Sequence, residues 1–248
     1  MGTDDRQPAN PTIGDHTDYK RKRLNMSPEL QKAGGFSAIA LAACYLIGFA
    51  MFIFVLDSSG YSGPSGSVAF AADHAFQLFL TTLVSYVLAG LFLVVLVLAL
   101  NDRLKTHAPG AMQIATAVGI IWAAIVLVSG MLSILGADSV TRLAETDPER
   151  AATVWLAVGI VQNVLGGGTE FVGGVWITLV SLAGLRGRGL PRALNLFGVF
   201  IGLAGIVTIY PDFDPLNAVF GLSQIVWFVW VGVEMLARKS NKLKPSAA

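Results

Sequence analysis

The chain is organised by six long apolar segments that are separated by shorter polar ones. The segments run approximately over residues 34–56, 74–100, 110–136, 151–185, 190–210 and 216–237. Each has at least the length of about 20 residues that an α-helix needs to cross a hydrocarbon core of about 30 Å. Unbroken apolar runs of this length favour helices over the alternating strands of roughly ten residues in a membrane barrel. The pattern predicts an all-α fold, a polytopic membrane bundle of six transmembrane helices.

Composition agrees with a membrane protein and argues against a soluble one. Of the 248 residues, 54% are hydrophobic and 13% are charged, and the mean hydropathy is +0.65. An ordinary soluble domain has about 25% charged residues. We therefore expect membrane lipid to be the main surroundings of this chain.

The basic residues are concentrated in alternate loops. The first, third and fifth loops hold eight of the sixteen acidic residues but only two basic ones, Arg142 and Arg150. The other fifteen Lys and Arg residues lie before the first segment, in the second and fourth loops and after the last segment: Arg6, Lys20, Arg21, Lys22, Arg23, Lys32, Arg103, Lys105, Arg186, Arg188, Arg192, Arg238, Lys239, Lys242 and Lys244. Because cytoplasmic loops are enriched in Lys and Arg, both termini are predicted to be cytoplasmic. This asymmetry explains the basic residues without a nucleic-acid partner and predicts a multi-pass membrane protein.

We interpret residues 27–240 as one transmembrane domain between two cytoplasmic tails, residues 1–26 and 241–248. The first tail is polar and basic, which predicts disorder, and it has no apolar run typical of a cleavable signal. The loop 57–73 is rich in glycine and serine and is not expected to be helical. Asp147 followed by Pro148 predicts a capped start for the fourth helix. That helix is longer than the bilayer is thick, so its first ten or so residues should extend beyond it.

Glu170 is the residue that lipid would tolerate least. It lies in the fourth segment, sixteen residues before Arg186, and therefore about 24 Å from that boundary in a helix. A charged carboxylate at this depth is costly, so Glu170 should face the bundle and be protonated, paired or hydrated. Glycines such as Gly166 and Gly173 share its helical stripe and leave room for a neighbouring backbone or a ligand.

Other segments carry polar side chains at helical spacing, several of them at a similar depth. We expect an outer-facing polar cavity around Glu170, and the candidate ligand-binding residues are Glu170, Gln224, Tyr45, Ser85, Thr81, Asn163 and His74. A structural role is the alternative for each, because Ser, Thr and Gln in membrane helices often form interhelical hydrogen bonds worth about 0.6 kcal/mol. A protonated Glu170 can act in the same way.

The fifth segment carries a stripe of small residues, Gly198, Gly202 and Gly205. This spacing puts the three glycines on one face of a helix, which predicts close packing against another helix.

Motifs for catalysis, metal binding or cofactor binding are not found. The histidines, His16, His74 and His107, belong to the first tail and to loops on opposite sides, so they form neither a metal site nor a haem-binding pair. The Gly166–Gly168 run is not followed by the Lys-Ser/Thr of a phosphate-binding loop. We assign no catalytic residue, no metal and no cofactor.

The region 184–202 resembles a family of bacterial six-span membrane proteins with no assigned function. It contains Gly-Leu-Arg-Gly-Arg-Gly-Leu-Pro-Arg followed by spaced glycines, and the opening of the first segment from Gly34 to Gly48 is similar too. The last segment, which contains tryptophan and ends in basic residues, also agrees. The resemblance implies the six-span topology and supplies no site residue.

These observations lead to one functional hypothesis and two alternatives. The protein is expected to bind or carry a small molecule or a lipid in the cavity around Glu170. As an accessory subunit of a membrane complex, or as a homo-oligomer, it would instead use the glycine stripe of the fifth segment against a partner helix. As an intramembrane enzyme it would need a second reactive group beside Glu170, such as His74 or Tyr45.

Overall fold

The computed structural model describes residues 28–187, 189–213 and 215–237. Within them the chain forms only helices, and the all-α prediction is confirmed. In order, the elements are α2 (Pro28–Phe54), α3 (Gly63–Asp73), α4 (Ala75–Thr82), the π-helix η1 (Leu83–Leu88), α5 (Ala89–Leu104), α6 (Pro109–Ala144), α7 (Pro148–Arg186), α8 (Arg192–Val207), the 3₁₀ turn η2 (Pro211–Phe213) and α9 (Pro215–Ala237). The tails predicted at 1–26 and 241–248 lie outside the described residues.

Five helices in the described part of the chain are long and apolar enough to cross a membrane. They are α2, the continuous rod formed by α4, η1 and α5, then α6, α7 and α9. The expected fifth segment, 190–210, contains a shorter helix, because α8 has 16 residues and thus a length of about 24 Å. The turn at Pro211 follows it within four residues, since a proline cannot continue the helical hydrogen bonding.

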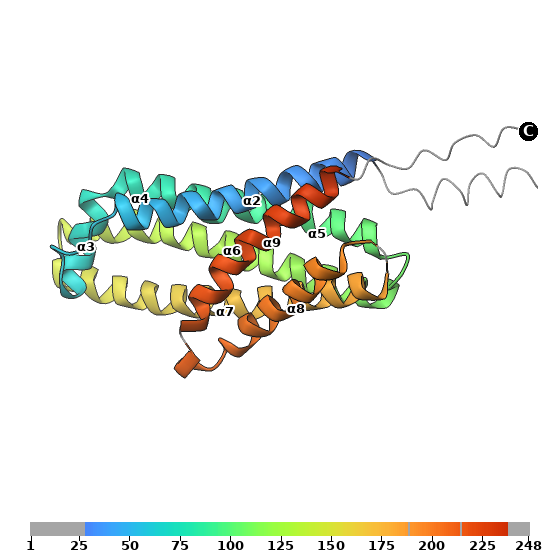
Figure 1. The fold of residues 1–248 in the computed structure, drawn as a ribbon. Coiled ribbons are helices and arrows are strands. Elements are labelled where there is room, and N and C mark those ends of the chain that lie inside the picture. Colours follow the sequence, from blue (N-terminus) through green and yellow to red (C-terminus); the bar gives the residue numbers. More distant parts are fainter. Residues whose placement is uncertain (1–27, 188, 214, 238–248) are drawn as a thin grey trace, which may run out of the picture.

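Six helices form a closed ring, and their order in space follows their order in the chain. α2 packs on α5, α5 on α6, α6 on α7, α7 on α8, α8 on α9, and α9 returns to α2. In Figure 1 the rods of α2, α6 and α7 run in nearly the same direction, while α8 and α9 are oblique to them. The connections from α5 to α6, α6 to α7, α7 to α8 and α8 to α9 are short, so each of these helices packs antiparallel to the next one in the chain.

The charged residues separate to the two ends of the bundle. The acidic end, where α3 and the α6–α7 turn lie, carries Asp57, Asp73, Asp138, Glu145, Asp147 and Glu149. The basic end, with the start of α2 and the α5–α6 and α7–α8 turns, carries Lys32, Arg103, Lys105, Arg186 and Arg192. The loops that the sequence groups by charge therefore lie together at the two ends, except the α8–α9 turn with η2, which Figure 1 shows at the lower edge of the bundle and away from the acidic end.

The expectation that loop 57–73 is not helical is wrong for its second half. Gly63 has a positive φ of 69°, Pro64 occupies the first turn, and α3 runs from there to Asp73. Val68 and Ala71 are buried, and α3 packs against α6 and α7. Burial of this apolar face outweighs the low helix propensity of the glycines and serines around it.

The start of α7 is as predicted. The Asp147 side chain accepts a hydrogen bond of 3.0 Å from the backbone N–H of Arg150, and Pro148 occupies the first turn. α7 then continues for 39 residues, about 58 Å. Its length exceeds the thickness of a bilayer core.

Glycines bring α7 and α8 into close contact. Gly198, Gly202 and Gly205 are all buried, and a Cβ atom at Gly205 would lie 2.6 Å from the carbonyl oxygen of Glu170. A Cβ at Gly202 would lie 2.7 Å from the carbonyl oxygen of Gly174. The predicted stripe therefore packs against α7 within the same chain.

Candidate functional site

The site begins where α9 and α2 separate. At the basic end the two helices touch, because a Cβ at Gly35 would lie 3.2 Å from the carbonyl oxygen of Gly232 and one at Gly232 would lie 2.9 Å from that of Gly35. Further along, a Cβ at Gly221 of α9 would meet only the ring edge of Phe49, at 3.6 Å. Figure 1 shows α9 crossing α2 near the basic end and then running away from it towards α7 and α8. This divergence opens space in the half of the bundle nearer the acidic end.

The π-helix η1 faces this space. Six residues, Leu83–Leu88, form a π-helix within the rod between α4 and α5, and the N–H of Ala89 bonds to the carbonyl of Val84, five residues earlier. Short π segments occur often at functional sites, since the extra residue shifts side chains around the helix. Ser85 is buried here, and its hydroxyl lies 3.5 Å from the carbonyl oxygen of Cys44. Gly48 allows this approach, because any Cβ at that position would overlap the Ser85 side chain.

This space is a partly open cavity of about 350 Å³, which we call the Glu170 cavity. Residues from α2, η1, α6, α7 and α9 line it: Tyr45, Gly48, Phe49, Phe52, Ser85, Tyr86, Trp122, Val126, Glu170, Asn217, Ala218, Phe220, Gly221 and Gln224. Its volume is in the range of small-molecule sites, and it combines an apolar wall with a few polar groups, as such sites do.

A core of aromatic rings supports the wall of the cavity. Trp122 lies 6.3 Å from Phe228 and 5.5 Å from Trp176, measured between ring centroids, and Trp176 lies 5.9 Å from Trp227. Trp122, Trp176, Trp227 and Phe228 are all at most 1% exposed. Because these rings pack on one another, they fix the position of Trp122 in the cavity wall.

Gln224 is the clearest polar anomaly at the site. It is 8% exposed, and its Oε1 atom has no hydrogen-bond partner among the described residues. Buried polar atoms in folded proteins nearly always have a partner, either protein, water or ligand. An amide oxygen of this kind beside a carboxylate makes the cavity suited to a polar guest.

Four of the predicted site residues meet at this cavity. Glu170, Gln224, Tyr45 and Ser85 all line it, although they come from four different elements.

The structure does not bring the other three to the cavity. Thr81 is buried, and its hydroxyl donates a 2.7 Å hydrogen bond to the carbonyl of Gln77. Asn163 is exposed on α7. His74 joins α3 to α4 and packs its ring at 4.6 Å from that of Phe70. The π-helix is part of the reason, since it breaks the regular stripe that would have aligned Thr81 with Ser85.

Sequence reasoning missed the aromatic residues of the wall. Phe49, Phe52, Tyr86, Trp122 and Phe220 look like ordinary apolar positions of membrane helices, so no sequence signal distinguishes them. Asn217 could have been found, because it lies two helical turns before Gln224 on the same stripe.

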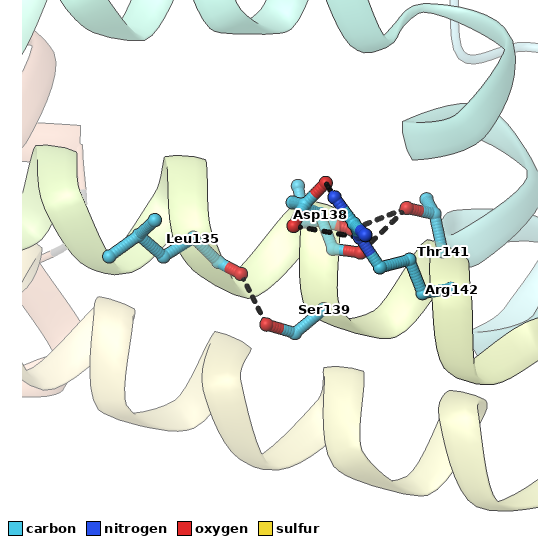
Figure 2. Close-up of polar contacts among 6 residues, drawn as sticks. Leu135, Asp138, Ser139, Thr141 and Arg142 are labelled. Atoms are coloured by element: carbon cyan, nitrogen blue, oxygen red, sulfur yellow. Dashed lines mark hydrogen bonds and ion pairs between the residues drawn. The ribbon is translucent and has the colours of Figure 1, made fainter.

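A second cavity, of about 360 Å³, lies at the acidic end between α3, α4, α6 and α7. Its wall includes Asp138 and Thr141, which Figure 2 shows on α6 beside Arg142. The Arg142 guanidinium donates to both carboxylate oxygens of Asp138, through Nε at 3.1 and 3.2 Å and through Nη2 at 3.1 Å. This acid is exposed and already ion-paired one helical turn away, so a structural role explains it.

A metal site is not formed by the part of the chain that the structure describes. In these residues His, Cys, Asp and Glu side chains do not gather in groups of three or more. The Glu170 cavity therefore offers hydrogen bonds, ring faces and one carboxylate.

The fold and the cavity together define a class: a ring-shaped bundle of helices, five of them long and apolar enough to cross a membrane, around a mixed aromatic and polar cavity. Residues 39–238 match the family described as "Domain of unknown function (DUF4386)", and the chain belongs to this family. The matched region contains every residue that lines the cavity. Neither a curated protein nor a solved structure matches the chain.

Proposed function

We propose that this protein is a multi-pass protein of the bacterial cytoplasmic membrane that binds a small molecule or a lipid in the Glu170 cavity. In this proposal α8 is the sixth span, both termini are cytoplasmic and the acidic end faces outward. The separation of basic and acidic residues to opposite ends supports the orientation.

One observation carries the binding proposal: a cavity of about 350 Å³ at membrane depth holds both Glu170 and the partnerless Oε1 of Gln224. A buried amide oxygen without a hydrogen-bond partner, such as the Gln224 Oε1, is costly unless something polar meets it. Cavities that stay empty in proteins are lined by apolar groups, because such groups need no hydrogen-bond partner. The polar lining of this cavity therefore favours a bound guest.

The position of the cavity supports entry from the bilayer. Phe49 and Phe52 of α2 line the cavity, and they are 41% and 55% exposed. Both residues lie on the part of α2 that α9 leaves uncovered, at a level where lipid would surround the bundle. A guest that partitions into the membrane can therefore reach the cavity between α2 and α9.

The binding proposal is tested by filling the cavity. Gly221→Leu adds a side chain at a lining position where a Cβ meets only Phe49 at 3.6 Å, so the helix can accept it. Gly159→Leu is the matched control, because nothing lies within 4 Å of a Cβ there and the residue does not line the cavity.

Native mass spectrometry of protein extracted in mild detergent is the measurement. Parent and Gly159→Leu proteins should carry a bound non-protein mass that Gly221→Leu lacks. Absence of bound mass from the parent, or its persistence in Gly221→Leu, would refute binding in this cavity.

The orientation is tested by labelling single cysteines on intact cells. Cys44 is buried and is replaced by Ala, and a cysteine is then introduced at Glu145 or at Arg192. A membrane-impermeant maleimide should label Glu145→Cys and should not label Arg192→Cys until the cells are permeabilised. The opposite pattern would overturn the cytoplasmic assignment of the basic end.

A further inference from the structure

We propose that the Glu170 cavity selects an apolar organic cation, an amine or quaternary ammonium that carries an apolar group. The inference rests on the proposed function, which it deepens by naming the chemical class of the guest.

Aromatic residues make up a large part of the wall. Six of the fourteen lining residues are aromatic: Tyr45, Phe49, Phe52, Tyr86, Trp122 and Phe220. They come from four elements, α2, η1, α6 and α9, so they surround the space instead of covering one side of it. The face of an aromatic ring carries a negative quadrupole, and a cation within about 6 Å of the ring centroid is attracted to it. Recognition of quaternary ammonium groups by aromatic cages is a common use of this attraction.

The charges at the cavity have one sign. Among the described residues that line it, Glu170 is the one carboxylate, and Lys, Arg and His do not contribute. The remaining polar groups, on Asn217, Gln224, Ser85 and the two tyrosines, are neutral hydrogen-bonding groups, and the Gln224 Oε1 adds a partnerless acceptor. An anion would be repelled by the Glu170 carboxylate. A cation, in contrast, offsets the cost of a carboxylate at membrane depth.

The size of the cavity sets the size of the guest. A volume of about 350 Å³ would hold roughly a dozen water molecules at about 30 Å³ each. A guest that fills the cavity therefore has about a dozen non-hydrogen atoms. Ammonium ion and simple amino acids would leave most of the rings without contact. A charged nitrogen with a phenyl-sized or short branched alkyl group fits both the volume and the apolar wall.

The experiment compares a cation with its neutral isostere. Benzyltrimethylammonium and neopentylbenzene have the same shape and differ in the nitrogen or carbon at one position. Binding to full-length protein is measured by tryptophan fluorescence, since Trp122 lines the cavity, in nanodiscs of zwitterionic lipid that do not adsorb cations by surface charge.

The proposal predicts that the parent binds the cation at least tenfold more tightly than the isostere. Glu170→Gln should weaken binding of the cation at least tenfold and leave binding of the isostere unchanged. Glu149→Gln, which changes an exposed acid in the first turn of the same helix, should change neither. Cation binding equal to isostere binding, or insensitive to Glu170→Gln, would overturn the cation assignment.

A second pair of variants covers the case in which Glu170→Gln does not fold. Tyr86→Phe keeps the ring and Tyr86→Leu removes it. The cation should bind the Phe variant as it binds the parent and the Leu variant severalfold more weakly, while the isostere should bind both variants alike. Equal loss of cation binding in both variants would refute the role of the ring face.

The two proposals fail in different ways. If the isostere binds the parent and Gly221→Leu abolishes that binding while the cation has no advantage, the cavity binds ligands but the cation assignment is wrong. If neither probe binds and the mass spectra show no bound mass, both proposals are wrong.

Discussion

Gly174→Ala tests the closest approach between two helices, that of α7 and α8. A Cβ atom at Gly174 would lie 2.6 Å from the carbonyl oxygen of Gly202, 2.8 Å from the backbone nitrogen of Ile206 and 2.9 Å from the carbonyl carbon of Gly205. All three atoms belong to the backbone of α8, so a side-chain rotation cannot relieve the contact. The helices themselves must move apart.

The size of the effect follows from the distances. Ordinary contacts of a Cβ atom begin near 3.4 Å, so the Gly174 to Gly202 approach must lengthen from 2.6 Å by about 0.8 Å. A gap of 0.5–1 Å forfeits about a quarter to a half of the dispersion energy of each separated atom pair. Overpacking of this kind costs about 1–3 kcal/mol, and we expect Gly174→Ala to lower the free energy of unfolding by that amount.

Gly159→Ala is the matched control on the same helix. A Cβ atom there meets nothing within 4 Å, and Ala has a higher helix propensity than Gly by up to about 1 kcal/mol. Reversible unfolding in mixed micelles, titrated with a denaturing detergent, gives both free energies. If the two variants unfold with the same free energy as each other, the reasoning from the α7–α8 contact is refuted.

Three further outcomes are expected. Gly48→Ala should destabilise the protein by about 1–3 kcal/mol, and Ser85→Gly should restore most of this loss in the double mutant, because both atoms that the new Cβ would meet belong to Ser85; additive effects in the unfolding titration would contradict it. Gln31→Leu should cost about 1–3 kcal/mol, since the Gln31 Nε2 donates at 2.7 Å to a backbone carbonyl in the last turn of α9; an unchanged unfolding midpoint would show that water replaces this bond. The hydrogen bond of 2.8 Å from the Tyr61 hydroxyl to the Asp73 carboxylate raises the pKa of Tyr61, so this contact is present below the ordinary pKa of about 10 and is lost as the pH rises through the folded value. Asp73→Asn should therefore lower the pKa of Tyr61 in an ultraviolet titration, and an unchanged or higher value would count against the contact.

Local patterns in the sequence determined the long apolar helices, the alternation of charge between loops and the identity of the costly acid. Apolar runs near 20 residues favour helices because a backbone in lipid must satisfy its own hydrogen bonds. Asp147 followed by Pro148 located the start of α7, since a cap and a proline act within a single turn. Glu170 stood out because its cost depends on its depth along one helix, which the sequence alone supplies.

Tertiary structure decided which of these residues meet. The Glu170 cavity exists because α9 touches α2 at Gly35 and Gly232 and then diverges from it, and no property of either helix alone sets that angle. The π-helix η1 and the helical α3 depend in the same way on what packs against them, on Gly48 in the first case and on α6 and α7 in the second. Contacts between segments distant in the chain have no local pattern, so the aromatic wall that we propose to select a cation became visible only when those segments came together.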